Sequence, residues 1–171
     1  MSRFLKVAES EKATEIVRVT GDNPLTDPII MDFMIEEHIN KKAEYTYTMD
    51  LPIGTRPEII NAKMLKRCYS LLQDPNASEY MTWMLNRPDQ FDTLKYNVEN
   101  QKIKRPEIVL TVDTQNELKV MQKIYKKFKG KIPKLEDVIF WLDQNQKILK
   151  TPIKNTKMDT ITEINYKLTV D

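Results

Sequence analysis

The sequence predicts an α/β fold in which a largely parallel sheet is covered by helices on both faces. Runs with strand character alternate with runs of helical periodicity along most of the chain, and such alternation is typical of parallel sheets. The run I-V-L-T-V at 108–112 is continuously apolar and β-branched, as expected of a strand buried on both faces. Helix start signals follow two of the strand-like runs, at Asp27 and at Thr114.

In the first half of the chain, hydrophobic spacing and turn residues define the expected elements. Phe4, Leu5 and Ala8 share one face of a helix over 2–12. Asp27 can cap a helix whose first turn accepts proline, and this helix is expected to end near Lys41. The remaining expected elements are a strand at 15–20, a strand at 45–49, a loop at 51–57, an extended piece at 58–60 and a helix at 61–72.

In the second half, the tetrapeptide T-Q-N-E at 114–117 is a capping box that begins a helix ending near Gly130. The other expected elements are helices at 78–86 and 133–145 and strands at 91–98 and 108–112. These elements form one predicted domain over 1–146. A polar extension over 147–171 follows it, in which a late strand at 164–170 is left open.

Composition excludes several classes of function. Lys and Arg number 27 against 25 Asp and Glu, so the net charge of +2 gives no general attraction to nucleic acid or to an anionic membrane. Cys68 is the only cysteine, which excludes an intrachain disulfide and favours a reducing, cytoplasmic location. No apolar run approaches the about 20 residues of a membrane span, and the first residues lack the apolar core of a signal peptide. The three glycines leave no glycine-rich phosphate loop.

Two aspartates stand where strand-like runs end. Asp22 lies in V-R-V-T-G-D-N-P-L-T-D-P at 17–28, and Asp113 in I-V-L-T-V-D-T at 108–114. If their strands run parallel in one sheet, both carboxylates emerge at the same edge, where two oxygen ligands could hold Mg²⁺ together with phosphate oxygens. Such an ion would neutralise charge on an α-phosphate as pyrophosphate leaves.

The alternative is that each aspartate is structural. Aspartate after a strand also favours turns and helix caps, and spacing alone does not decide between the two roles. The single histidine, His38, lies in the middle of a predicted helix and is expected at the surface.

Four motifs, taken in order, resemble a known family. They are the stretch at 17–28, P-I-G-T-R-P-E at 52–58, S-E-Y-M-T at 78–82, and L-T-V-D-T-Q-N-E-L-K-V-M-Q-K-I-Y at 110–125. Over roughly residues 3–145 the chain is similar to the spore-coat polysaccharide type of cytidylyltransferase, a branch of the acylneuraminate and Kdo cytidylyltransferase superfamily. The resemblance implies a three-layer α/β/α sandwich with a mostly parallel central sheet. It also implies a reaction in which Mg²⁺ and CTP activate a sugar or sugar acid as its CMP derivative.

Carried over to matching positions, the resemblance makes Asp22 and Asp113 Mg²⁺ ligands and catalytic residues. Substrate binding is assigned to residues of the first three motifs, namely Asn23, Pro52, Gly54, Glu58, Glu79 and Thr82. Glu58 would accept hydrogen bonds from sugar hydroxyls, the alternative being an exposed charge at a strand end. Arg56 lies in the same loop and is added as a partner for a sugar carboxylate or phosphate, although it matches no family signature.

Departures from the family pattern set the remaining expectations. Ser78 and Tyr80 stand where the family has arginine and histidine, which puts the substrate class in question. The family also begins with a strand and a glycine- and arginine-containing loop for the triphosphate. Because that part has no counterpart here, the fold is expected to be incomplete at its N-terminus, as in a fragment, a truncated product or one half of a split protein.

The predicted function is a metal-dependent cytidylyltransferase, or its C-terminal portion, acting in surface polysaccharide or glycan biosynthesis. Its expected partners are CTP and a sugar or sugar acid, without nucleic acid or membrane, while a homodimer and a separate N-terminal half are left open. The alternative is a non-catalytic, degenerate homologue that serves as a structural or dimerisation module. A third, weaker hypothesis is another nucleotidyltransferase, such as one acting on a sugar 1-phosphate.

Overall fold

A computed structural model of the chain describes residues 1–74 and 81–148. Helices and strands follow one another in the order α1 Ser2–Ser10, β1 Glu15–Arg18, α2 Pro28–Asn40, β2 Tyr45–Tyr47, β3 Glu58–Asn61, α3 Ala62–Leu71, α4 Met81–Leu85, β4 Thr93–Lys95, α5 Gln115–Lys127, α6 Leu135–Gln144 and the 3-10 helix η1 Gln146–Ile148. The predicted late strand at 164–170 lies outside the described residues, as does Glu79. None of the helices that the structure describes has the length and apolar character needed to cross a membrane.

The described sheet has four strands in the order β1-β3-β2-β4. β3 runs antiparallel to both of its neighbours, β1 and β2, whereas β2 and β4 are parallel. β1, β2 and β4 therefore share one direction, and β3 runs against them. This agrees with the predicted mostly parallel sheet.

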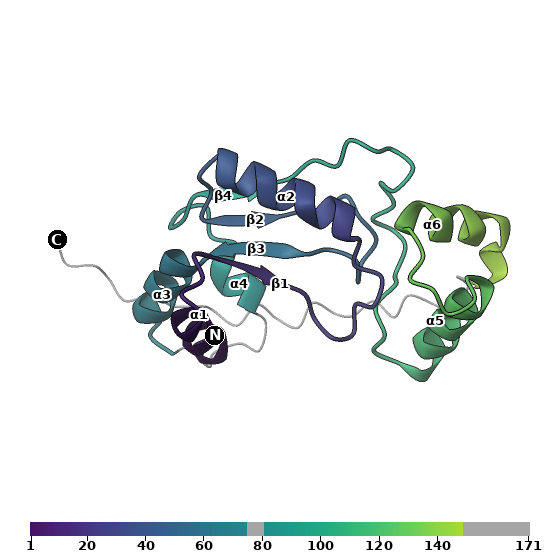
Figure 1. Ribbon diagram of the computed structural model, residues 1–171, viewed down its shortest axis with the longest axis horizontal. Coiled ribbons are helices and arrows are strands. Elements are labelled where there is room, and N and C mark those ends of the chain that lie inside the picture. The colour runs from purple at the N-terminus through teal and green to yellow at the C-terminus, as the bar shows by residue number, and fades with distance from the viewer. Residues whose placement is uncertain (75–80, 149–171) are drawn as a thin grey trace.

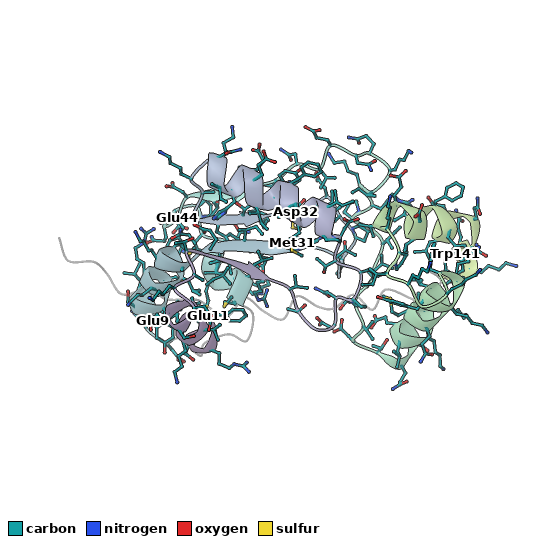
Figure 2. All side chains as sticks on the ribbon, in the orientation of Figure 1. Glu9, Glu11, Met31, Asp32, Glu44 and Trp141 are labelled. Atoms are coloured by element: carbon teal, nitrogen blue, oxygen red, sulfur yellow. The ribbon has the colours of Figure 1, made fainter. Side chains whose placement is uncertain are left out.

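Helices cover both faces of the sheet, as a three-layer arrangement requires. Figure 1 shows α2 on one face and α1, α3 and α4 on the other, with α5 and α6 beside the sheet. One apolar cluster joins Met34 of α2 and Ile59 of β3 to residues of α5 and α6, and a second joins Tyr45 of β2 and Ile60 of β3 to α3 and α4. In Figure 2, Glu9 on α1 lies toward one end of the molecule and Trp141 on α6 lies toward the other.

The predicted strand at 108–112 is wrong as a member of this sheet. Its only strand pairing in the described part of the chain is one parallel bridge between Ile53 and Val109. The Ile53 N–H donates to the Ile108 carbonyl at 2.9 Å, and the Leu110 N–H donates to the Ile53 carbonyl at 2.7 Å. The partner is the loop at 51–57, which turns away at Gly54, so pairing stops after one bridge. The apolar character of the run comes from burial of Ile108 and Leu110.

The helix caps are as predicted. Oδ1 of Asp27 accepts from the Ile29 N–H at 2.8 Å and the Ile30 N–H at 3.4 Å, and proline occupies the first turn of α2. At α5 both halves of the capping box between Thr114 and Glu117 form. These signals are local in sequence, which is why they could be recognised without the fold.

His38 is not at the surface, contrary to the prediction. Its side chain is 1% exposed, with Nδ1 at 2.8 Å from the Thr46 hydroxyl oxygen and Nε2 at 3.0 Å from a carboxylate oxygen of Glu15. His38 lies on the same helical stripe as the buried Ile30 and Met34. Because α2 carries apolar residues on all sides, its periodicity did not identify this stripe as the buried one.

Candidate functional site

The two predicted aspartates meet beyond the end of β1. The Val112 N–H donates to the backbone carbonyl of Asp22 at 2.9 Å, which places the segment before Asp113 directly against the turn at Asp22. The prediction that parallel strands of one sheet bring Asp22 and Asp113 together is wrong. β1 ends at Arg18, and the segment at 110–112 lies outside the sheet. The convergence arises from a backbone contact between two loops.

One carboxylate oxygen of this pair lacks a hydrogen-bond partner among the described residues, and the two carboxyl groups repel each other. Oδ1 of Asp22 is the one buried side-chain polar atom in the described part of the chain that lacks a hydrogen-bond partner. Partial desolvation raises the pKa of Asp113, which is otherwise an exposed residue, and the negative charges of Asp22 and Glu117 raise it further, while a hydrogen bond with the Thr111 side chain lowers it. Two neighbouring carboxylates with a buried acceptor left free are typical of a site that receives a cation or a donor.

Helix α5 holds both aspartates in place. One oxygen of Glu117 accepts from the Asp113 N–H at 2.8 Å and from the Thr114 N–H at 2.7 Å. The hydroxyl of Tyr125, on the same helix, donates to the Pro24 carbonyl at 3.1 Å. The turn at 20–23 is closed by the Asn23 N–H, which donates to the Thr20 carbonyl at 3.0 Å. This backbone hydrogen bond closes the turn that presents Asp22.

Gly54 lets the loop at 51–57 approach the segment that leads to Asp113. A Cβ at this position would lie 2.2 Å from the Thr111 nitrogen and 2.6 Å from the Leu110 carbonyl carbon. Gly54 also has φ +87°, a conformation that side-chain-bearing residues rarely adopt. Pro52 is buried in this loop, and its carbonyl accepts from the Thr55 hydroxyl at 2.9 Å. Pro52 and Gly54 thus fix the position of the loop.

Glu58 is buried in a polar network and is not the exposed strand-end charge that was the alternative. The residue is 8% exposed. One of its oxygens accepts from Nη1 of Arg18, and the other accepts from the Tyr45 hydroxyl and, at 2.7 Å, from the Thr82 hydroxyl. Burial raises the pKa of Tyr45, and the adjacent Glu58 charge raises it further. Thr82, predicted from its motif, is therefore brought to Glu58.

Sequence reasoning missed two members of this network, Arg18 and Tyr45. Arg18 is separated from Glu58 by 40 positions, so no local pattern joins them. One signal was present. In β1 the side chains alternate, and Arg18 falls on the face of Ile16, which packs against the apolar cluster around Ile60. A charge on an inward-facing strand position requires a buried partner.

Arg56 lies apart from this network and braces its own loop. Its Nε donates to the Leu51 carbonyl at 2.8 Å. Burial lowers the pKa of Arg56, while the charge of Asp50 acts in the opposite direction. The guanidinium is thus partly removed from water within the loop at 51–57.

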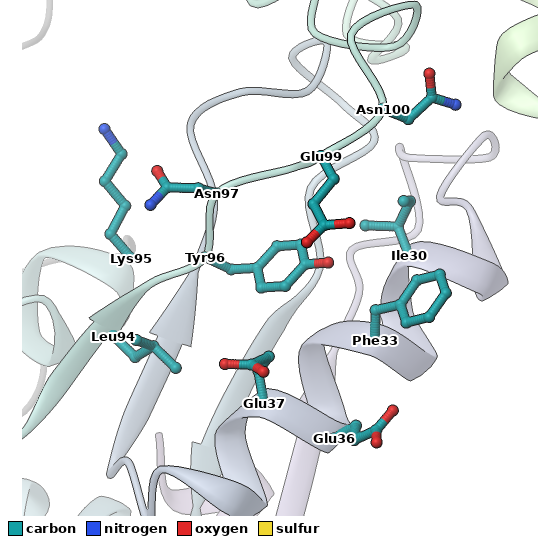
Figure 3. A pocket seen from close by; sticks show the side chains of 10 residues that line it. All are labelled: Ile30, Phe33, Glu36, Glu37, Leu94, Lys95, Tyr96, Asn97, Glu99 and Asn100. Carbon is teal, nitrogen blue, oxygen red and sulfur yellow. The ribbon is translucent and has the colours of Figure 1, made fainter.

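A cavity of about 780 Å³ lies elsewhere, between α2 and the segment that follows β4. Figure 3 shows Tyr96 in this cavity with Phe33 on α2 and the carboxylates of Glu37 and Glu99 nearby. Burial raises the pKa of Tyr96, and the charges of Glu99 and Glu37 add to the effect. None of the predicted site residues lines this cavity, so it is separate from the aspartate pair.

Residues 1–74 and 81–148 contain no cluster of three or more His, Cys, Asp or Glu side chains suited to a metal ion. The aspartate pair offers two carboxylates. That number suits Mg²⁺, which proteins commonly hold through one or two carboxylates together with substrate phosphates and water.

Comparisons with known proteins agree with the fold. A profile of the family described as cytidylyltransferase matches residues 1–129. The spore coat polysaccharide biosynthesis protein SpsF of Bacillus subtilis (strain 168) is 30% identical over 129 residues, which are 74% of this chain and 53% of that protein. The uncharacterized protein MJ1063 of Methanocaldococcus jannaschii is 26% identical over 149 residues, covering 86% of this chain and 61% of that one.

A solved cytidylyltransferase from Leptospira borgpetersenii has the same fold. The TM-score is 0.78 at 23% identity, over 88% of this chain and 64% of that chain. This likeness shows the α/β fold that was predicted. The chain spans less than two thirds of the length of each of these three proteins.

Proposed function

The chain belongs to the cytidylyltransferase family, and from that premise we propose that it forms part or all of an enzyme that transfers CMP from CTP to a sugar or sugar acid, with release of pyrophosphate. The observation that carries the proposal is the pairing of Asp22 and Asp113, in which a buried carboxylate oxygen has no partner among the residues described. A role in surface polysaccharide or glycan biosynthesis is supported by the likeness to the Bacillus subtilis spore coat protein.

The aspartate pair fits Mg²⁺. Its donors are hard carboxylate oxygens, and one of them is buried without a hydrogen bond. Bound there with phosphate oxygens, Mg²⁺ would supply a Lewis acid at the α-phosphate of CTP. Asp22 and Asp113 would hold the ion, and Glu117 would keep the Asp113 backbone in position through its two accepted hydrogen bonds.

The other site residues would shape and bind the substrates. Gly54 admits the close approach of the loop at 51–57, and the backbone N–H of Asn23 closes the turn before Pro24. Glu58 and Thr82 lie at the edge of the sheet where β1 ends and from which the chain leads to Asp22, which supports a place near the substrates. The proposal also assigns Arg56 and Glu79 to substrate binding. It further includes a homodimer and a separate N-terminal half.

Pyrophosphate release tests this function. The chain, and a version extended upstream where the gene continues, would be incubated with CTP, Mg²⁺ and a panel of sugars and sugar acids. We expect release that requires both CTP and an acceptor and that is lost in Asp22→Asn and Asp113→Asn. If no acceptor leads to pyrophosphate release and calorimetry detects no CTP binding, the non-catalytic homologue is favoured. Replacing CTP by UTP or GTP tests for another nucleotide specificity.

A further inference from the structure

Arg18 and Glu58 lie at the same edge of the sheet as the aspartate pair. Arg18 is the last residue of β1 and is the register partner of Glu58, the first residue of β3. Because β3 is antiparallel to β1, the chain enters Glu58 from the loop containing Gly54 and leaves Arg18 toward Asp22. The charged pair and the aspartates are thus joined by two short segments at one edge.

Both oxygens of Glu58 are already in use. They accept from donors on three different elements, Arg18 on β1, Tyr45 on β2 and Thr82 on α4. With the residue 8% exposed, this carboxylate is a fixed counter-charge inside the protein. An acceptor held by three internal donors is poorly placed to reorganise for a sugar hydroxyl, but it is well placed to fix a guanidinium.

Unlike the oxygens of Glu58, most N–H donors of Arg18 have no hydrogen-bond acceptor among the described residues. A guanidinium has five N–H donors. Within the described residues, only Nη1 of Arg18 has an acceptor, although its side chain is just 18% exposed. Arg105, at 30% exposure, by comparison binds Glu107 through Nε and both oxygens of Asp143 through Nη1.

We infer that Arg18 forms an oxyanion-binding subsite, with Glu58 as the residue that positions its guanidinium. The inference rests on the function proposed above and names the chemistry of its ligand, a carboxylate or phosphate group. The Nε and Nη2 edge of the fork remains for such a group, which a guanidinium can bind through two parallel, charge-assisted hydrogen bonds. The ligand group is either the carboxylate of a sugar acid or a phosphate of the nucleotide.

Arginine side-chain NMR tests the subsite directly. The Nε–Hε signal of Arg18, assigned by its loss in Arg18→Lys, would be followed while the full chain is titrated with three probes in Mg²⁺ buffer. The probes are CTP, inorganic pyrophosphate, and N-acetylneuraminate with its uncharged methyl ester as the matched control. We expect a saturable shift with at least one oxyanion and none with the ester. A response to the sugar acid identifies the sugar carboxylate, and a response to CTP and pyrophosphate identifies a phosphate.

Substitutions separate binding by Arg18 from positioning by Glu58. Arg18→Lys keeps a positive charge against Glu58 but loses the fork, so binding of the responding probe should weaken about ten- to hundredfold. Glu58→Gln should broaden or displace the free-state Arg18 signal before any probe is added and should weaken binding as well. Arg67→Lys is the matched control, because Arg67 also pairs with a glutamate, Glu44, but at the opposite edge of the sheet, where β2 begins. Arg67→Lys should bind the responding probe as tightly as the unsubstituted chain does.

The subsite is refuted if the Nε–Hε signal of Arg18 does not change when any of the three oxyanions is added. If the backbone amides of Gly21 and Asn23 still respond to CTP and Mg²⁺ in that experiment, the proposed function stands and Arg18 is structural. If those amides are silent too, this chain does not bind CTP by itself, and the pyrophosphate assay of the upstream-extended version then decides whether the proposed function fails as well. The titration itself uses the unsubstituted chain. If Arg18→Lys does not fold, the Arg18 signal is assigned instead by through-bond correlation to its own backbone amide, and the test remains decisive.

Discussion

At the scale of single residues, the role proposed for the Asp22–Asp113 pair opposes stability. Both carboxylates stay close together, and partial desolvation and mutual repulsion raise the pKa of Asp113. A group whose pKa is higher in the folded state than in the unfolded chain stabilises the fold only while it is protonated. This contribution is therefore complete below the ordinary aspartate pKa and is lost as the pH rises through the raised value.

Asp113→Asn should consequently raise the melting temperature at pH 7 in Mg²⁺-free buffer while abolishing the proposed transfer activity. The gain should disappear as the pH falls below the ordinary aspartate range, where Asp113 is protonated in both states. Mg²⁺ with CTP should stabilise the unsubstituted chain and not the variant. Calorimetric melting between pH 3 and 8 measures all three effects. Asp32→Asn, an exposed position on α2, is the control. A lower melting temperature for Asp113→Asn at pH 7 would instead indicate a capping role.

Gly54→Ala should damage the link between the two site loops. Its new Cβ meets the Thr111 and Leu110 backbone and its φ is positive, so we expect a loss of about 2–5 kcal/mol. Gly130→Ala is the matched control, since Gly130 also has a positive φ but its Cβ would meet nothing within 4 Å, and it should cost about 1–2 kcal/mol. Denaturant unfolding measures both, and faster hydrogen exchange at Leu110 should accompany only the first. Equal losses would refute the close approach.

At the scale of helices and strands, His38 joins α2 to β1 and β2 through Glu15 and Thr46. His38→Leu fills similar space but leaves those two groups without their partner, which should cost about 1–3 kcal/mol for each one that stays unsatisfied. Ile39→Ala, at a side chain that is 56% exposed on the same helix, should change stability by no more than about 0.5 kcal/mol. Chemical denaturation distinguishes the two variants. An unchanged stability in His38→Leu would show that the contact contributes nothing.

The elements also show how far sequence could predict this structure. Helix starts at Asp27 and Thr114 were correct because a cap and its donors lie within three residues of each other. The strand at 108–112 was wrong because apolar content reports burial and does not identify a pairing partner, which here is a glycine-containing loop. The proximity of Asp22 and Asp113 was expected because each follows a strand-like run and lies in a family motif, whereas Arg18 and Tyr45 were missed because each meets Glu58 only through the folded sheet.

At the scale of the whole molecule, one apolar cluster runs from α2 and β3 to α5 and α6. This continuity predicts that the α5–α6 region unfolds together with the sheet. The chain has two tryptophans, Trp83 on α4 and Trp141 on α6, so each region carries its own fluorescent probe. In Trp83→Phe and Trp141→Phe, the fluorescence of the remaining tryptophan should give the same midpoint as the circular dichroism of that same variant. An earlier transition reported by Trp141 would reveal a separately unfolding α5–α6 unit.

The missing side chain at Gly54 has a consequence for divergence among related proteins. Because two backbones touch there, neither the loop at 51–57 nor the segment at 108–113 can be lengthened or shifted without displacing the other. Insertions should therefore be excluded from both segments or occur in both at once. Insertions should instead accumulate in neighbouring loops that are free of this contact.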